Sequence, residues 1–458
     1  MQPLAMEYLS WGRARHYEHY VFPLSFIDTA HDALRTAAGH GRSVLAYGLG
    51  RSYGDSCLND GEALLDTRAL DRFIAFDATS GEIQCEAGVS LADVLGILTS
   101  RPPDEPRWFL PVTPGTKFVT IGGAIANDVH GKNHHAAGCF GSHVRSLRLL
   151  RSDGTELECS PERNGEVFSA TIGGLGLTGL ILSACIRLKR VPGFWLESEE
   201  IRYDTLDAFF QLSEESAADW EYTMAWVDCL GRGRHLGRGV FSRSRHTAGT
   251  PARCDESVSL RPRLSVPVDL PEFVLNRHSV GAFNRLYWRR FPRLPRRRLR
   301  AIDPILYPLD AIAHWNRLYG SRGFFQYQCV VPMNRARGAV SALLDRAAAS
   351  GEGSFLSVLK VFGNRPSPGL LSFPMHGATL ALDFPNRGRA TLELLEALDR
   401  IVRDAGGRLY PAKDGRMSAA DFQHGFPRWK ELAQCADPAF SSTFWRRVTI
   451  ECASERAP

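Results

Sequence analysis

The first third of the chain alternates short apolar runs with glycine-rich turns, a pattern typical of short β-strands. Residues 44–46 form one such run and lead into a cluster of glycines. Residues 145–151 and 155–159 form two more, and the Ser152-Asp153-Gly154 turn between them predicts a hairpin. The pattern continues to about residue 190, which predicts a strand-rich N-terminal region.

The middle of the chain has apolar residues at helical spacing. Residues 205–215 can form a helix with Asp204 as its cap. Residues 339–349 predict a second helix that ends near Gly351, and the apolar positions within 392–402 predict a third. Strand-like segments separate these helices, at residues 324–331 and 355–362. The mixture predicts an α+β fold, with helices packed on an antiparallel sheet in the central part.

The composition is that of a folded chain of two or three domains. Of its 458 residues 44% are apolar and 23% charged, and a net charge of +5 does not by itself indicate nucleic-acid binding. The ten cysteines include no C-x-x-C pair, so we expect buried small residues in a reducing compartment. The sequence shows neither a signal-peptide core nor an apolar run long enough to span a membrane, which predicts a cytoplasmic protein.

The segment 285–300 differs from this average, because eight of its sixteen residues are arginine and none is acidic. Pro292 and Pro295 argue against a long helix. One interpretation is a basic surface loop. Because aromatic residues lie among the arginines, the other is a peripheral contact with an anionic membrane, at the inner face of the cell membrane, or with a phosphate group. No fold motif supports nucleic acid as a partner.

Two glycine-rich motifs suggest contact with a ligand. Gly48-Leu49-Gly50-Arg51-Ser52-Tyr53-Gly54-Asp55 follows a predicted strand, and its glycines would let N–H groups approach phosphate oxygens. The Rossmann pattern would need glycine in place of Tyr53, so the motif is either another kind of phosphate loop or a tight turn. In the second motif, Gly122-Gly123-Ala124 would let backbone lie against a flat or charged ligand.

Three histidines follow the second motif: His130, His134 and His135. The first two are four residues apart, a spacing that binds metal when it lies on a helix. Gly131 and Asn133 make a helix unfavourable here. A loop in contact with a cofactor is therefore preferred to a hydrogen-bonded polar loop or a metal site, and no metal is expected.

A third glycine-rich motif spans residues 168–179, where glycine could also serve close strand packing. The order and spacing of the three motifs resemble the vanillyl-alcohol oxidase, or p-cresol methylhydroxylase (PCMH), type of FAD domain. Further motifs along nearly the whole chain are similar to the decaprenylphosphoryl-ribose 2-oxidase family of flavoenzymes. They are Ser10-Trp11-Gly12-Arg13, residues 51–55, residues 130–135, Ala225-Trp226, residues 325–328, residues 360–363, Asp383-Phe384-Pro385 and residues 407–410.

The resemblance implies a PCMH-type FAD-binding domain of two α+β subdomains at residues 1–193. A central substrate domain would follow at 194–407, with an antiparallel sheet covered by helices, and a C-terminal segment, 408–458, would return to the FAD domain. Many relatives tether flavin through a histidine in the first loop. Here Tyr53 lies near that position, so FAD is expected to bind non-covalently. The implied FAD contacts are Ala46, Gly48, Gly50, Arg51, Ser52, Tyr53, Gly54, Asp55, Gly115, Thr120, Gly122, Gly123, Asn127, His130, Ile181, Tyr410 and Lys413.

The implied reaction moves a hydride from a carbinol carbon to the flavin while a base or water takes the hydroxyl proton. Lys413 is the candidate for offsetting negative charge on the reduced flavin, and His130 and Tyr53 are candidates for orienting the hydroxyl or relaying its proton. The implied substrate contacts are Trp226, Gln326, Gln328, Lys360, Thr379 and Ala381. The last two stand where the family often has asparagine and cysteine, which reshapes the pocket more than the reaction.

The leading hypothesis is oxidation at C2 of a polyprenyl-phosphate-linked ribose in cell-wall arabinan synthesis. An NAD(P)H-dependent short-chain reductase would then be the partner that completes epimerisation to the arabinose form. One alternative is a soluble aldonolactone or alditol oxidase. Another is a catalytically silent protein that binds flavin or polyprenyl phosphate.

Overall fold

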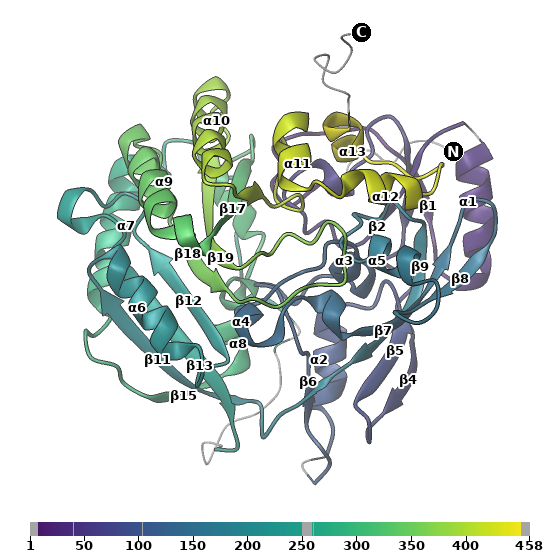
Figure 1. Cartoon of the computed structure of the whole chain (residues 1–458), viewed down its shortest axis with the longest axis horizontal. Helices are drawn as coiled ribbons and strands as arrows, with labels where there is room; N and C mark the ends of the chain where they lie inside the picture. The colour runs from purple at the N-terminus through teal and green to yellow at the C-terminus, as the bar shows by residue number, and fades with distance from the viewer. Residues whose placement is uncertain (1–7, 40, 103, 250–258, 260, 450–458) are drawn as a thin grey trace.

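Three β-sheets form the frame of the molecule, and helices lie both outside the sheets and between them (Figure 1). The structure is a computed structural model that describes residues 8–39, 41–102, 104–249, 259 and 261–449. The helices are α1 Ala30–Gly39, α2 Leu91–Thr99, α3 Ile121–Ala126, α4 His134–Ala137, α5 Gly165–Thr171, α6 Leu206–Ser216, α7 Arg277–Arg290, α8 Ile302–Leu306, α9 Ala336–Ser350, α10 Arg389–Asp404, α11 Ala419–Gly425, α12 Trp429–Cys435 and α13 Thr443–Val448. No helix in the described ranges is both long and apolar enough to cross a bilayer.

The N-terminal half contains two of the sheets. A parallel sheet has the strand order β1-β3-β2, and an antiparallel sheet has the order β4-β5-β9-β7-β8. Their strands are β1 Tyr20–Pro23, β2 Val44–Tyr47, β3 Ala63–Asp66, β4 Phe73–Asp77, β5 Glu82–Glu86, β7 Val144–Leu150, β8 Glu156–Cys159 and β9 Leu180–Arg187. The expected hairpin is present as β7 and β8.

The third sheet is antiparallel, with the order β15-β11-β13-β12-β18-β19-β17-β20. Its strands are β11 Trp195–Tyr203, β12 Tyr222–Val227, β13 Gly239–Thr247, β15 Arg298–Ala301, β17 Phe324–Pro332, β18 Ser357–Phe362, β19 Gly377–Pro385 and β20 Arg408–Leu409. Two short pairs complete the strands: β6 Trp108–Phe109 with β10 Lys189–Arg190, and β14 Leu264–Ser265 with β16 Ile312–Ala313. The α+β fold expected from the sequence is thereby confirmed.

The two faces of the eight-stranded sheet differ in chemistry because side chains alternate along each strand. Tyr327, Cys329, Leu380 and Leu382 point to one face, where they pack with apolar residues of α6, α9 and α10. The register pairs Gln326 with Asp383, Gln328 with Ala381 and Lys360 with Thr379 on the other face. One face therefore forms a core and the other presents polar groups.

The C-terminal segment returns to the N-terminal sheets. Val44 N–H donates to Ala439 O at 2.7 Å, and Thr443 N–H donates to Leu58 O at 2.9 Å. Figure 1 shows α12 and α13 beside β1 and β2, with α11 next to α13. The C-terminal segment thus packs against the N-terminal sheets, while the boundaries at residues 193 and 407 stay a prediction.

Two local predictions were wrong, the cap of α6 and the loop at residues 285–300. Thr205, not Asp204, caps α6 by accepting from Ala208 N–H. Gly122-Gly123-Ala124 is helical in α3, because Thr120 caps that helix and accepts from Gly123 N–H at 3.1 Å, and contact of this backbone with a ligand stays a prediction.

The segment 285–300 is helical as far as Arg290. Asn276 starts α7 with a capping box, and Pro292 and Pro295 follow the end of the helix, where they do not break it. The interpretation of the whole segment as a loop is corrected accordingly.

Candidate active site

A cavity of about 530 Å³ lies between the N-terminal sheets and the polar face of the eight-stranded sheet. Its walls come from the loop after β2, from segment 114–132 with α3, from strands β12, β17, β18 and β19, and from segment 410–413. The N-terminal half, the central sheet and the C-terminal segment of the chain thus all contribute to one site.

The loop after β2 passes very close to its neighbours, which explains its glycines. A Cβ at Gly48 would come within 2.5 Å of Thr120 Oγ1. At Gly50, where φ is +60°, a Cβ would come within 2.2 Å of the Tyr47 hydroxyl. Arg51 follows, with its guanidinium 4.1 Å from the centre of the Trp11 ring. The backbone of the loop is therefore held at the cavity wall.

Several polar groups in the cavity wall lack partners. Within the described residues, Arg51 Nε, Ser56 Oγ and His130 Nδ1 are buried and make no hydrogen bond. Burial also lowers the pKa of the Arg51 guanidinium. Leaving such groups unpaired costs free energy, which a polar ligand would recover. Glycine-lined backbone and unpaired donors fit the pyrophosphate and the polar ring edge of FAD.

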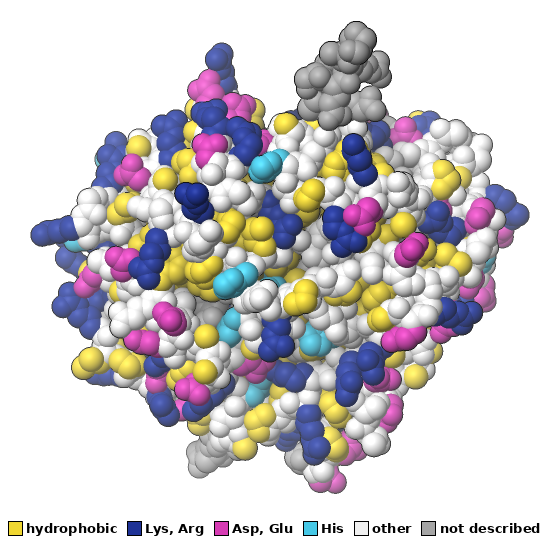
Figure 2. Space-filling view, in the orientation of Figure 1, with side chains coloured by type: hydrophobic (Ala, Val, Ile, Leu, Met, Phe, Trp, Pro, Cys, Tyr) yellow, Lys and Arg dark blue, Asp and Glu magenta, His cyan; other side chains and the backbone are white. Residues whose placement is uncertain are grey.

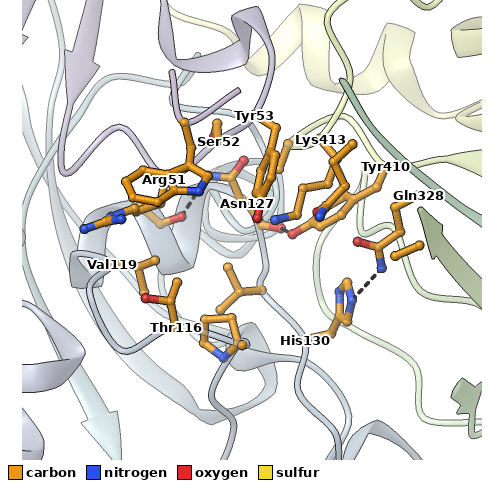
Figure 3. A pocket seen from close by; sticks show the side chains of 18 of the residues that line it. Arg51, Ser52, Tyr53, Thr116, Val119, Asn127, His130, Gln328, Tyr410 and Lys413 are labelled. Atoms are coloured by element: carbon orange, nitrogen blue, oxygen red, sulfur yellow. Dashed lines mark hydrogen bonds between the residues drawn. The ribbon is translucent and has the colours of Figure 1, made fainter. Parts of the chain in front are cut away.

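One end of the cavity is built by contacts between the first loop and the C-terminal segment. Tyr53 N–H donates to Ala412 O at 2.9 Å. Lys413 Nζ lies 3.9 Å from the centre of the Tyr53 ring (Figure 3). Burial raises the pKa of the Tyr53 phenol well above its usual value, so this group stays protonated and can donate a hydrogen bond.

Gly54 and Asp55, expected to contact FAD, are absent from the cavity wall. A Cβ at Gly54 would be 1.5 Å from Asp414 O, so glycine is required for the two backbones to touch. Asp55 is buried and forms an ion pair with Arg447 at 2.7 Å. These residues join the chain ends and so fix the position of Lys413.

Asp383 is a buried carboxylate in the same wall, opposite in charge to Lys413. Its Oδ1 accepts from Gln326 Nε2 at 2.7 Å and its Oδ2 accepts from the Tyr319 hydroxyl at 3.3 Å. Burial raises the pKa of Asp383 to about 7, against the lowering effect of Gln326 and Lys413. Burial likewise lowers the pKa of Lys413 to about 7, and Asp383 opposes that shift. Both groups are therefore poised to exchange protons near neutral pH.

His130 lies inside an aromatic cage of Phe362, Phe373 and Tyr410, with ring centres 4.8–5.6 Å away. Gln328 Nε2 donates to its Nε2 at 3.1 Å (Figure 3), which assigns the ring proton to Nδ1. Burial and the nearby lysines hold the pKa of His130 well below its ordinary value. The ring is neutral and offers Nδ1–H as a donor.

Two more lysines line the cavity. Lys132 Nζ donates to the carbonyl oxygens of Ile305 and Leu306. Lys360 Nζ lies 3.5 Å from Gly131 O. Burial lowers the pKa of Lys132 to about 7 and that of Lys360 to about 8. An anionic ligand would stabilise the charged form of both.

The structure brings nearly all residues singled out in the sequence to this one cavity. Its wall includes Ala46, Gly48, Gly50, Arg51, Ser52, Tyr53, Gly115, Thr120, Gly122, Gly123, Asn127, His130, Ile181, Trp226, Gln326, Gln328, Lys360, Thr379, Ala381, Tyr410 and Lys413. Gly54 and Asp55 are the exceptions described above.

Sequence reasoning missed Asp383 and Lys132 as site residues. Each lies in a quoted motif, Asp383 before Phe384-Pro385 and Lys132 within the histidine run. The alternation of β19 could have indicated Asp383, because it shares a face with Thr379 and Ala381. Gly176 and Gly179, which had strand packing as their simplest explanation, also line the cavity.

The three histidines of residues 130–135 do not point to one ion. His130 bonds to Gln328, His134 packs 4.6 Å from Phe362, and His135 Nε2 bonds to Trp220 O. Within the described ranges no cluster of three or more potential metal ligands is found.

His134 gives a prediction about stability. Burial lowers the pKa of His134 to about 3, and both ring nitrogens lack partners in the described structure. A lowered folded-state pKa contributes stability above pH 6.5 that is lost as the pH falls toward 3. As the pH falls from 6.5 toward 3, the unfolding free energy of His134→Leu should therefore decrease less steeply than that of wild type, by about 1.4 kcal/mol per pH unit. Denaturant unfolding at several pH values measures the unfolding free energy of both proteins. Equal slopes of this free energy against pH for wild type and variant would contradict the prediction.

Comparison with known proteins agrees with this geometry. Residues 19–160 match a family model described as an FAD binding domain. The chain is 35% identical to a decaprenylphosphoryl-β-D-ribose oxidase of Mycolicibacterium smegmatis, over 96% of this chain and 97% of the relative. It is 34% identical to an uncharacterized Streptomyces coelicolor protein over 75% of this chain and 96% of that protein. A bovine L-gulonolactone oxidase is 31% identical over 43% of this chain and 44% of the relative.

The fold, the glycine-lined cavity and the FAD-domain match define an FAD-dependent oxidoreductase. FAD is its cofactor. By identity along almost its full length, the chain belongs to the decaprenylphosphoryl-β-D-ribose oxidase family.

Proposed function

We propose that this oxidase acts on a polyprenylphosphoryl-ribose and converts its C2 hydroxyl to a ketone. The observation that carries the proposal is the shared cavity, in which nucleotide-binding loops meet a wall bearing lysines, amides and a carboxylate. The M. smegmatis relative is named for a decaprenylphosphoryl-ribose, a substrate of the same chemistry.

We assign the FAD pyrophosphate to the loop of residues 46–53 and the flavin to residues near Asn127, His130 and Lys413. When bound, FAD supplies the acceptor for the hydride that leaves the carbinol carbon. Tyr410 supports this end, since its hydroxyl donates to Asn127 O at 3.2 Å.

The proton of the sugar hydroxyl is assigned to Asp383. Its carboxyl group lies in the cavity wall, and burial raises its pKa to about 7, so Asp383 can accept a proton near neutral pH. Lys413 provides positive charge in the same wall. Tyr53 and His130 are both neutral, so they act as hydrogen-bond partners that orient the substrate.

The sugar and its phosphate are assigned to the polar face of the eight-stranded sheet. Gln326 and Gln328 offer amides toward hydroxyl groups, and Lys132 and Lys360 offer ammonium groups toward the phosphodiester. Trp226 provides a flat apolar surface. Thr379 and Ala381, being small, leave room for the ring between these groups.

The assignment of Asp383 predicts the pH dependence of flavin reduction. A base is active when deprotonated, so the rate should rise with pH through about 7 as Asp383 ionises. Because the pKa of Lys413 is also about 7, the rate should fall again above neutral pH as Lys413 loses its proton, which leaves a narrow maximum near pH 7. Asp383→Asn should remove the rising limb and slow reduction roughly 100-fold, leaving the falling limb. Stopped-flow rates across the pH range measure this, and a rising limb that persists in Asp383→Asn assigns the proton elsewhere.

The substrate is tested by mixing the FAD-loaded protein with candidates in the absence of oxygen. A short-chain polyprenylphosphoryl-ribose should bleach the flavin absorbance rapidly, while free ribose and aldonolactones should not. Rapid bleaching by a lactone, with none by the lipid-linked sugar, would favour an aldonolactone oxidase instead. The ketone product requires reduction to give the arabinose form, so we also propose an NAD(P)H-dependent reductase as the functional partner.

A further inference from the structure

The exposed apolar side chains of this protein are concentrated in one stretch of the chain. In the described residues, seven of the ten exposed large hydrophobic residues fall between residues 264 and 299: Leu264, Val268, Phe273, Phe283, Leu286, Leu294 and Leu299. Leu286 is 70% exposed and Leu294 78%. Exposed apolar residues gathered in this way indicate a surface that contacts another body.

The same stretch is strongly basic. Nine arginines and no acidic residue lie between residues 277 and 300. Arg293, Arg297 and Arg300 pair with carboxylates of the central sheet. The remaining six make no ion pair with any described residue: Arg277, Arg285, Arg289, Arg290, Arg296 and Arg298. Figure 2 shows Lys and Arg side chains gathered along the edge of the molecule where α7 lies.

Helix α7 is fixed to the body by its inner face. Asn284 Nδ2 donates to Asp228 Oδ1 at 2.9 Å, and Trp288 Nε1 donates to Tyr203 O at 3.1 Å. Leu286, Arg289 and Arg290 are exposed on the same helix. The helix therefore presents apolar and basic groups together, the combination found in helices that lie in a membrane interface.

This surface is continuous with the cavity through aromatic rings. Phe283 of α7 stacks on Tyr287 with ring centres 5.7 Å apart, and Tyr287 lies 4.8 Å from Trp226. Phe355 lies 6.0 Å from Phe283 on the other side. All four residues line the cavity. An apolar wall thus runs from the outside of α7 to the assigned sugar site.

We propose that α7 and the chain up to Leu299 dock on an anionic lipid bilayer, so that the aromatic wall receives the first isoprene units of a membrane-held substrate. The unpaired arginines would face lipid phosphates, and Leu286 and Leu294 would insert among acyl chains. The purpose of the docking rests on the proposed lipid-linked substrate, whereas the docking itself can be measured without turnover.

The test is flotation of the FAD-loaded full-length protein with phosphatidylcholine vesicles, with and without phosphatidylglycerol. Wild-type protein should float with the anionic vesicles, and salt should weaken binding. Each of the single variants L286S and L294S should weaken binding to the anionic vesicles roughly tenfold or more. R289Q and R290Q should weaken it about fivefold each.

I74S is the matched control, because Ile74 is 48% exposed on β4 in another sheet. It should float like wild-type protein. Absence of flotation, or equal flotation of the leucine variants and wild type, would overturn the docking surface. Flavin bleaching by a short-chain substrate in solution, without vesicles, tests the proposed function separately, and the leucine variants should match wild type there.

Discussion

Replacing Lys413 by alanine is expected to slow reduction of the bound flavin by the sugar about 100- to 1000-fold, the usual cost of losing one charge-stabilising group in an active site. Lys413 lies beside Tyr53 and shares the cavity wall with Asp383, so its ammonium is close to where charge changes during the reaction. FAD should remain bound, because the loop of residues 46–53 carries its pyrophosphate contacts. Anaerobic stopped-flow gives the rate, and the flavin absorbance of the purified variant gives the occupancy.

The control for this variant is Lys430→Ala, which removes an exposed lysine outside the cavity. Its rate should equal that of wild type. A Lys413→Ala protein that keeps its FAD and is reduced at the wild-type rate would show that the ammonium has no part in the chemistry.

Replacing Gly123 by valine is expected to raise the dissociation constant of FAD roughly 10- to 100-fold, so that the protein is purified nearly colourless. Gly123 lines the cavity on α3, and a Cβ there would already be 3.1 Å from Thr120 Oγ1. The two methyl groups of valine would displace the capping threonine or occupy space assigned to FAD. Reconstitution with added FAD, followed by fluorescence, measures the affinity.

Gly338→Val serves as the matched control, because Gly338 is exposed on α9 and a Cβ there meets no atom within 4 Å. That protein should be yellow and active. A yellow, active Gly123→Val protein with unchanged melting temperature would mean that α3 does not contact the cofactor.

Much of the site could be predicted because glycine loops leave a strong local pattern. The spacing of Gly48 and Gly50 after a strand indicated close backbone contact, and the structure shows those contacts with Thr120 and Tyr47. Helices α9 and α10 followed from apolar periodicity and the glycines after them. These features depend on neighbouring residues, which the sequence displays directly.

The features that were missed depend on residues far apart in the chain. The role of Gly54 and Asp55 follows from contacts with Asp414 and Arg447, and nothing near residue 54 in the sequence shows that segment. The raised pKa of Asp383 arises from burial between separate elements. Helix α7 was missed because Pro292 and Pro295 argued against a helix, although both prolines lie beyond its last turn. Burial and long-range contact had to come from the structure.

Oxidation at C2 is measured most directly by a single turnover without oxygen, in which a short-chain polyprenylphosphoryl-ribose is mixed with an equal amount of FAD-loaded protein. The product is then trapped with borodeuteride, which places deuterium at any newly formed carbonyl carbon. We expect one C2-labelled sugar for every flavin bleached. Bleached flavin with no label at C2, or a flavin that stays yellow with this substrate, would contradict it.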